Sequence, residues 1–297
     1  MYHNPVLLNE CISGLNINPE GIYVDVTFGG GGHSREIIKH LTTGKLIAFD
    51  QDIDALNNSI NDERFVLVNH NFKFLKNFLK LHNASKVNGI LADLGVSSHQ
   101  FDVPERGFST RFDSALDMRM NQNQTLSAAD IVNNYDEEEL GKILKEYGEI
   151  KNYRCFVKAI LETRETKQIE STSHLIESIK KCYPQHKKNK FLAQVFQALR
   201  IEVNDEMKVL KLLLQQCEES LVSGGRLVVM SYHSLEDRLV KNFIKSANFE
   251  GKIEKDFYGN PIVQFKSITR KPIVPDEEEI ESNNRARSAK LRIAEKL

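Results

Sequence analysis

The stretch that decides the fold is Asp25-Val26-Thr27-Phe28-Gly29-Gly30-Gly31-Gly32-His33-Ser34. The apolar run 21–26 leads into it and predicts a β-strand, while Ile37, Ile38 and Leu41 follow at helical spacing. The glycines leave the turn without side chains, so N–H groups at the helix start can approach a polar or anionic ligand group closely. The stretch therefore predicts a strand, a ligand-binding turn and a helix.

A second strand ends in an acid at the spacing that a nucleoside site requires. The apolar run 45–49 is followed by Asp50, about twenty residues beyond the glycines, where a carboxylate can accept hydrogen bonds from a ribose diol. The glycines alone would also suit a tight turn that binds nothing. Together, the strands, turn, helix and acid favour the mononucleotide-binding half of an α/β sheet.

The glycine frame argues against two common nucleotide motifs. In a G-x-G-x-x-G reading, the third small position falls on Ser34 or Arg35, which leaves an NAD enzyme as a remote alternative, and no P-loop pattern occurs. The remaining pattern, with one acid before the glycines and another after the next strand, resembles the cofactor site of class I S-adenosyl-L-methionine (SAM) methyltransferases. We therefore expect Gly31, Gly32, His33 and Asp50 to contact this cofactor.

Two more strand-like runs end in polar segments. The run 64–72 ends near Phe72, which could cover an adenine face or pack in the core. The run 87–92 ends in the segment 93–100, Asp93-Leu94-Gly95-Val96-Ser97-Ser98-His99-Gln100. Ligands of open α/β sheets bind outside the carboxyl ends of the strands, so this segment is the expected reaction site.

At this point the chain resembles a known family, the ribosomal RNA small subunit methyltransferase H family (RsmH, also called MraW). The resemblance extends over nearly the whole chain and rests on eight motifs in the family's order: His3-x-Pro5-Val6-Leu7-Leu8-x-Glu10, Asp93-Leu94-Gly95-Val96-Ser97-Ser98-x-Gln100, Arg106-Gly107-Phe108-Ser109, Leu116-Asp117-Met118-Arg119-Met120, Phe196-Gln197-Ala198-Leu199-Arg200-Ile201, Gly224-Gly225-Arg226-Leu227, His233-Ser234-Leu235-Glu236-Asp237-Arg238 and Arg287-Ser288-Ala289-Lys290-Leu291-Arg292. It implies SAM-dependent methylation of the exocyclic N4 of one cytidine, cytosine 1402, in the decoding region of 16S rRNA. It also implies SAM contacts for Asp93 and Gln100.

The chemistry suggests further roles. A cytosine amine is a poor nucleophile, so an acceptor for its proton would help, and Asp93, Ser97 and Ser98 are the nearest candidates. His233, at the end of a later strand, is either a catalytic base or an orienting group. Enzymes that modify a base take it out of its stack. The candidates for holding substrate RNA are Arg106, Phe108 and Arg119, although phenylalanines and methionines in this region also suit a domain anchor.

The organisation of the chain changes after the fourth strand. Apolar residues follow helical spacing between residues 104 and 204, which predicts an inserted helical domain for substrate recognition. The flanking segments, 1–103 and 205–297, would form one discontinuous methyltransferase domain. A fifth strand is predicted at 225–230, and the segments 262–265 and 289–294 are predicted to close the sheet.

Composition is compatible with this interpretation. The 297 residues include 40% hydrophobic and 27% charged residues, and the net charge of −1 argues against bulk electrostatic coating of nucleic acid. Two basic clusters, within 180–190 and 285–292, could supply local RNA contacts. The four cysteines form no C-x-x-C pair, so we expect neither a disulfide nor structural zinc, and we expect a cytoplasmic protein without a membrane segment.

Two alternatives are a second kind of enzyme and a protein of a different, non-catalytic class. A DNA amino-methyltransferase typically carries [DNS]-P-P-[YFW] after the fourth strand, where this chain has Asp93-Leu94-Gly95-Val96. A non-catalytic SAM-sensing or RNA-binding module would be expected to lack polar residues of the reaction loop, and the segment 93–100 retains them. SAM already carries an electrophilic methyl group, so no metal is expected. The expected partner is 16S rRNA or the small ribosomal subunit, and the sequence leaves open whether the chain forms a homodimer.

Overall fold

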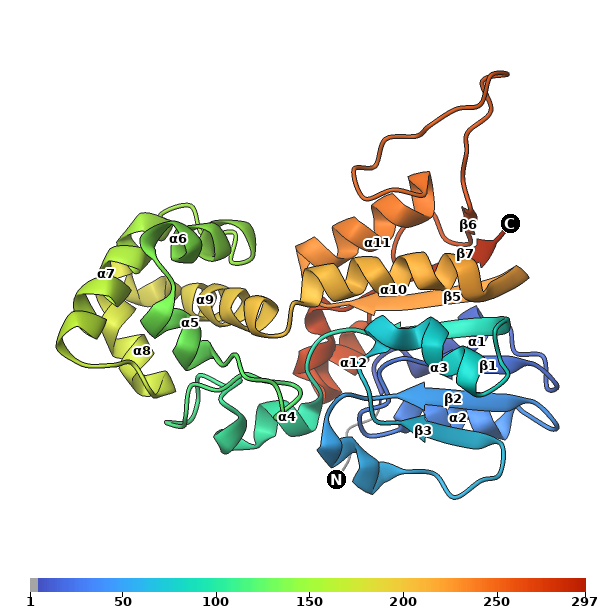
Figure 1. Cartoon of the computed structure of the whole chain (residues 1–297), viewed down its shortest axis with the longest axis horizontal. Coiled ribbons are helices and arrows are strands. Elements are labelled where there is room, and N and C mark those ends of the chain that lie inside the picture. The colour runs from blue at the N-terminus through green and yellow to red at the C-terminus, as the bar shows by residue number, and fades with distance from the viewer. Residues whose placement is uncertain (1–4) are drawn as a thin grey trace. The chain divides into compact units, whose positions relative to one another are not determined.

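The computed structural model describes residues 5–297, and the chain divides into two compact units (Figure 1). The first unit combines the described residues up to Gly95 with Met207–Leu297, and the second is Val96–Glu206. The second unit thus begins at Val96, inside the polar segment 93–100, whereas the inserted domain is predicted from residue 104. His3, part of one quoted motif, lies outside the described residues.

A seven-stranded sheet forms the first unit, in the order β3-β2-β1-β4-β5-β7-β6. Strands β1 to β5 are parallel to one another, and β7 is antiparallel to both β5 and β6. The closing strand predicted at 262–265 is shorter than expected, because β6 begins only at Phe265. The strands are β1 Ile22–Asp25, β2 Lys45–Phe49, β3 Phe65–Val68, β4 Val87–Asp93, β5 Leu221–Ser231, β6 Phe265–Ser267 and β7 Lys290–Lys296.

Alternation along the strands divides the core into two layers. On β4, Ile90 and Ala92 belong to one apolar cluster, whereas Leu91 belongs to the other, because successive side chains point to opposite faces. One face packs against α1 Leu8–Leu15 and α2 Gly32–Lys39, and the other against α3 Leu75–Leu81, α10 Glu206–Ser220 and α11 Ser234–Ser246. Shorter elements complete this unit: η1 Ile53–Asn58, η2 Phe72–Phe74, α12 Glu277–Ser282 and η6 Asn284–Ser288.

The second unit is helical and has its own apolar core. Side-chain caps fix where its helices begin: Ser127 and Asp136 each accept a hydrogen bond from the third backbone N–H of the helix that follows. Within the described part of the chain, no helix combines the length and apolar character needed to cross a bilayer. The helices are α4 Ser98–Asp102, η3 Pro104–Arg106, α5 Ala128–Asn134, α6 Glu137–Glu146, α7 Tyr153–Thr166, α8 Thr172–Ile179, η4 Lys180–Cys182, η5 Gln185–Lys187 and α9 Lys188–Val203.

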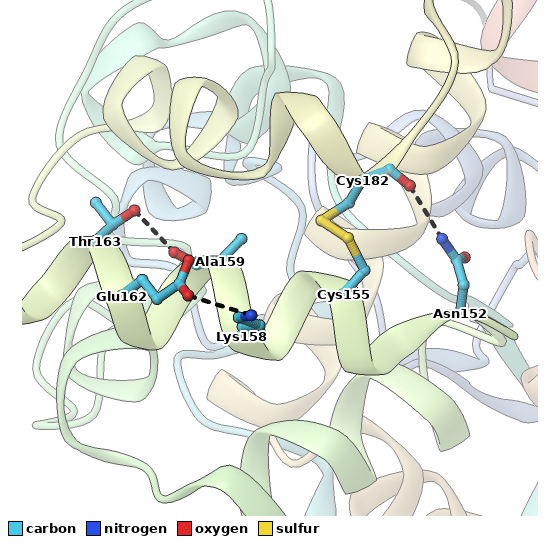
Figure 2. The surroundings of a disulfide bond; sticks show 7 residues. All are labelled: Asn152, Cys155, Lys158, Ala159, Glu162, Thr163 and Cys182. Carbon is cyan, nitrogen blue, oxygen red and sulfur yellow. Dashed lines mark hydrogen bonds and ion pairs between the residues drawn. A yellow bond between two sulfur atoms is a disulfide. The ribbon is translucent and has the colours of Figure 1, made fainter.

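A disulfide joins Cys155 on α7 to Cys182 on η4, so the prediction that the cysteines form none is wrong (Figure 2). The two Cα atoms lie 5.6 Å apart, within the range that a disulfide requires. Asn152 supports the same junction by donating from Nδ2 to the Cys182 carbonyl at 3.0 Å. The sequence did not indicate this disulfide, because the packing of α7 against η4, and not a short spacing, brings the two sulfur atoms together.

Replacing Cys155 with serine should lower the stability of the oxidised helical unit by about 3 kcal/mol. The bond closes a loop of 27 residues, and a cross-link of that span removes about this much chain entropy from the unfolded state. Thermal unfolding with and without a thiol reductant measures the effect. Reductant should lower the unfolding temperature of the parent and leave the C155S variant unchanged, whereas an unaffected parent would contradict the prediction.

Candidate functional site

The turn after β1 is organised around the buried carboxylate of Asp25. One of its oxygens accepts from the backbone N–H of Thr27 at 3.1 Å, and the other accepts from the Ser34 hydroxyl at 2.7 Å. The hydroxyl oxygen of Thr27 accepts in turn from the backbone N–H of Asp93 at 2.7 Å. These contacts fix the carboxyl ends of β1 and β4 relative to the glycine loop.

Asp50 lies directly after β2 and faces the same loop. Its Oδ2 accepts from the Gly29 N–H at 2.7 Å, and its Oδ1 accepts from the Asp52 N–H at 2.9 Å. Burial raises the pKa of Asp50 to about 6, against the lowering effect of these hydrogen bonds. Each carboxylate oxygen has a second lone pair, so the group can also accept hydrogen bonds from a diol.

The backbone of the loop requires glycine at specific points. Gly29 and Gly31 have φ of +52° and +75°, and Gly31 is the N-cap of α2. At Gly32 a Cβ atom would lie 2.2 Å from Cγ of Pro5, so the close approach of the N-terminal segment excludes a side chain. The predicted ligand-binding turn is therefore a tight turn that leads directly into a helix N-terminus.

Asp93 is the last residue of β4, and its carboxylate lies close to two side chains from distant segments of the chain. The Tyr232 hydroxyl donates to its Oδ1 at 2.8 Å, and His33 Nδ1 lies 3.9 Å from its Oδ2. His33 Nε2 is 3.2 Å from the Val6 carbonyl, which can only accept, so Nε2 carries a proton. Burial raises the pKa of Asp93 to about 6, whereas His33 and the Tyr232 hydrogen bond lower it. Such a carboxyl group can exchange a proton near neutral pH.

Phe72 follows β3 at the start of η2, half-buried against the core cluster on one face of the sheet. The adenine contact stays a prediction. Asparagines hold this loop in place: Asn69 Nδ2 donates to the Asp50 carbonyl at 3.0 Å, and Asn71 Nδ2 donates to Gln51 Oε1 at 2.7 Å. The loops after β2 and β3 are thereby joined.

The other candidates of the β4 loop belong to the helical unit. Ser97 is the N-cap of α4 and accepts from the Gln100 N–H at 3.2 Å, while Gln100 Oε1 accepts from the Ser97 N–H at 3.1 Å. Ser98 is the first residue of that helix, and the Gln100 side chain is buried. This reciprocal capping box gives Ser97 and Gln100 a structural role. Their roles in catalysis and in cofactor binding stay predictions.

The three candidate RNA contacts are also engaged within the helical unit. Arg106 is buried and donates from one guanidinium nitrogen to the carbonyls of Arg119 and Met120, both at 3.0 Å. Arg119 forms a two-pronged ion pair with Asp117, at 2.8 Å for each nitrogen, and Phe108 is 5% exposed in the core. These contacts hold the three side chains within the helical unit, and the RNA role of the three residues stays a prediction.

His233 follows β5 and is the N-cap of α11. Its side chain is 8% exposed, with Nε2 3.2 Å from Oε1 of the buried Glu236. Glu236 Oε2 also accepts from the Tyr232 N–H at 2.9 Å. Glu236 thus contacts both the histidine and the backbone beside Tyr232. The role of His233, as a catalytic base or as an orienting group, stays a prediction.

Sequence reasoning missed the most direct partner of Asp93. Tyr232 lies 139 residues further along the chain, and no spacing rule connects the two positions. Only the pairing of β4 with β5 brings both strand ends together, with Asp93 opposite Met230. Thr27 was also overlooked, although it lies inside the quoted glycine stretch.

The electrostatics of the strand ends suit a cationic ligand. Asp25 contributes to the raised pKa of both Asp50 and Asp93, because like charges disfavour one another. His33 lies close enough to both carboxyl groups to lower the pKa of Asp25 and of Asp93. SAM carries a sulfonium and an ammonium group, and its ribose carries a diol that a carboxylate placed like that of Asp50 can bind. The donor set thus fits this cofactor, and sheet and site together define a class I SAM-dependent methyltransferase.

Comparison with known proteins identifies the family within this class to which the chain belongs. A model of the MraW methylase family matches residues 1–297, and the chain belongs to this family. The chain is 61% identical over 297 residues to "Ribosomal RNA small subunit methyltransferase H" of Flavobacterium johnsoniae, covering 100% of this chain and 98% of the relative. A relative of the same name from Cytophaga hutchinsonii is 57% identical, with 100% of both chains covered.

Solved structures are more distant. A putative methyltransferase from Streptococcus mutans in complex with SAH is 14% identical, covers 100% of both chains and has a TM-score of 0.41. An rRNA methylase from Streptococcus thermophilus is 13% identical with a TM-score of 0.40, covering 98% of this chain and 93% of the other.

Proposed function

We propose that this methyltransferase transfers a methyl group to the exocyclic N4 of one cytidine of 16S rRNA, cytosine 1402 in the decoding region. Support comes from the family match over residues 1–297 and from relatives whose names specify small-subunit ribosomal RNA. Bacterial ribosomes are assembled in the cytoplasm, so the proposal places the chain there. The helical unit, Val96–Glu206, would grip the RNA.

The observation that carries the chemistry is the pair of carboxylates Asp50 and Asp93. Bound SAM supplies an electrophilic methyl group, so the chain must align the acceptor and remove one proton. Asp50 would hold the ribose diol. As the nitrogen–carbon bond forms, the methyl–sulfur bond would break and leave S-adenosylhomocysteine. The cytosine amine would become positively charged, and the Asp93 carboxylate would accept its proton. The Tyr232 hydroxyl, 2.8 Å from Asp93, would keep that carboxylate oriented.

The proposal is tested by labelled methyl transfer from SAM to 16S rRNA and to small subunits that lack the modification, followed by mapping of the modified nucleotide. We expect label on N4 of a single cytidine of 16S rRNA. Label on DNA or protein would overturn the assignment of the substrate, and label on a carbon atom of a base would overturn the assignment of the acceptor atom.

The rate of methyl transfer should fall as the pH is lowered through about 6. Asp50 and Asp93 both have pKa values of about 6, and only their ionised forms serve as full acceptors, so activity is present above this pH and lost below it. At pH 5 each group would be about 90% protonated, which corresponds to about a tenfold loss for each.

The Tyr232→Phe variant distinguishes the contribution of Asp93 to the pH dependence from that of Asp50. The Tyr232 hydrogen bond lowers the pKa of Asp93, so its removal should shift the inflection of the rate profile to higher pH. SAM binding should keep its pH dependence, because Tyr232 is not among the groups that shift the pKa of Asp50. The measurement is single-turnover methyl transfer against pH, with calorimetric SAM binding at the same pH values. An unshifted rate profile would contradict the role given to Tyr232.

A further inference from the structure

The segment between α11 and β6 forms a projecting hairpin that none of the roles above uses (Figure 1). Lys255 pairs with Pro261 across it, and the Ile262 N–H donates to the Glu254 carbonyl at 2.8 Å. At its tip, Phe257 is 98% exposed and Tyr258 is 86% exposed. Full exposure of two adjacent aromatic side chains forgoes the burial that normally stabilises them.

Hydrogen bonds hold the backbone of the tip in one turn. The Asp256 carboxylate accepts from the N–H groups of Tyr258 and Asn260 at 2.9 and 2.8 Å, and from the Asn260 side chain at 3.1 Å. The Gly259 N–H donates to the Asp256 carbonyl at 3.0 Å, with Gly259 at φ +88°. The two rings meet edge to face at 5.7 Å, an arrangement that leaves ring faces open. A preordered tip loses little conformational freedom when it binds.

The charge around the tip differs from that of the whole chain. Residues 252–271 contain five exposed basic and two acidic side chains, a net charge of +3, whereas the chain has −1 overall. One of the two acids, Asp256, accepts hydrogen bonds within the turn. The exposed basic side chains of this segment are Lys252, Lys255, Lys266, Arg270 and Lys271. Exposed aromatic rings among basic side chains are the features with which proteins bind single-stranded nucleic acid.

We propose that Phe257 and Tyr258 form a stacking platform for unpaired bases of the RNA substrate, with the basic side chains of residues 252–271 on neighbouring phosphates. This inference rests on the proposed function and adds a substrate contact outside the carboxylate site. Stacking is independent of base identity, because every base has a π-face, so the tip would add affinity and leave the choice of nucleotide to other contacts.

The kinetic test uses the full chain with small subunits that lack the modification. The double variant Phe257→Ala/Tyr258→Ala should raise KM for the subunit by about tenfold or more, since one stacked base contributes about 5- to 150-fold, and leave kcat and SAM affinity unchanged. The double variant Phe257→Leu/Tyr258→Leu keeps apolar surface and removes the ring faces, and it should lose as much. Ile253→Ala, on the same hairpin, is the matched control and should behave like the parent.

A spectroscopic test does not depend on turnover. The chain contains no tryptophan, so Tyr258→Trp introduces a single fluorophore at the tip. Single-stranded RNA should quench its emission, and a duplex of equal length should not. Absence of quenching, or leucine variants that retain the parent KM, would overturn the stacking platform. Failure of the parent to methylate RNA would instead overturn the proposed function, while the quenching measurement would still decide the role of the tip.

Discussion

Replacing Asp50 with alanine is expected to weaken SAM binding by about a hundredfold or more. In the proposed function the carboxylate accepts hydrogen bonds from the ribose diol, and each hydrogen bond to a charged group contributes about 1.5–3 kcal/mol. Two such bonds contribute about 3–6 kcal/mol to binding. Since each factor of ten in affinity corresponds to about 1.4 kcal/mol, their loss weakens binding by about a hundredfold or more. The substitution also removes the acceptor of the Gly29 N–H, which helps to hold the glycine loop.

Calorimetric titration of SAM into the parent and the variant measures this loss. Glu63→Ala is a matched control, because it removes an exposed carboxylate just before β3 and should leave affinity unchanged. Asp50→Asn keeps an acceptor for Gly29 and should fall between the parent and Asp50→Ala. An Asp50→Ala variant that folds normally and binds SAM like the parent would exclude Asp50 from the cofactor site.

Replacing Asp93 with asparagine should lower the rate of methyl transfer by about a hundredfold to a thousandfold. General bases contribute about this much, and an amide of the same shape cannot accept the proton of the cytosine amine. Asparagine preserves an oxygen acceptor for the Tyr232 hydroxyl, which donates to Asp93 at 2.8 Å. The position of the side chain should therefore be retained.

The comparison of rate with affinity identifies the role of Asp93. If the residue accepts the proton, single-turnover methyl transfer should fall much more than SAM affinity, which should change less than tenfold. Equal losses in rate and affinity would show that Asp93 acts through cofactor binding alone. Tyr232→Phe, which leaves the carboxylate in place, should cost much less at pH 8 than Asp93→Asn.

The carboxyl ends of β1, β2 and β4 were predictable because sequence-local signals define them. An apolar run followed by Asp25, Asp50 or Asp93 marks the end of a buried strand, and parallel strands bring such ends to one edge of the sheet. The glycine turn was equally visible, since positive φ at Gly29 and Gly31 requires residues without Cβ.

Long-range packing explains what the sequence did not reveal. Tyr232 meets Asp93 only through the pairing of β4 with β5, and Cys155 meets Cys182 only through the packing of two helical segments. The position of Arg106 just after the fourth strand predicted a phosphate contact, but it did not reveal that the guanidinium donates to two backbone carbonyls.

The projecting hairpin was also not predicted, because the strand beside it begins later in the chain than expected. The segment 262–265 is predicted to be a sheet strand, but β6 begins only at Phe265.

The most direct test of the account is equilibrium binding of SAM and of S-adenosylhomocysteine to the folded parent chain at pH 7.5, with NAD as the comparison ligand. We predict one site per chain for both sulfur nucleosides and no binding of NAD. A well-folded chain that binds neither sulfur nucleoside, or that binds NAD in their place, would contradict the account.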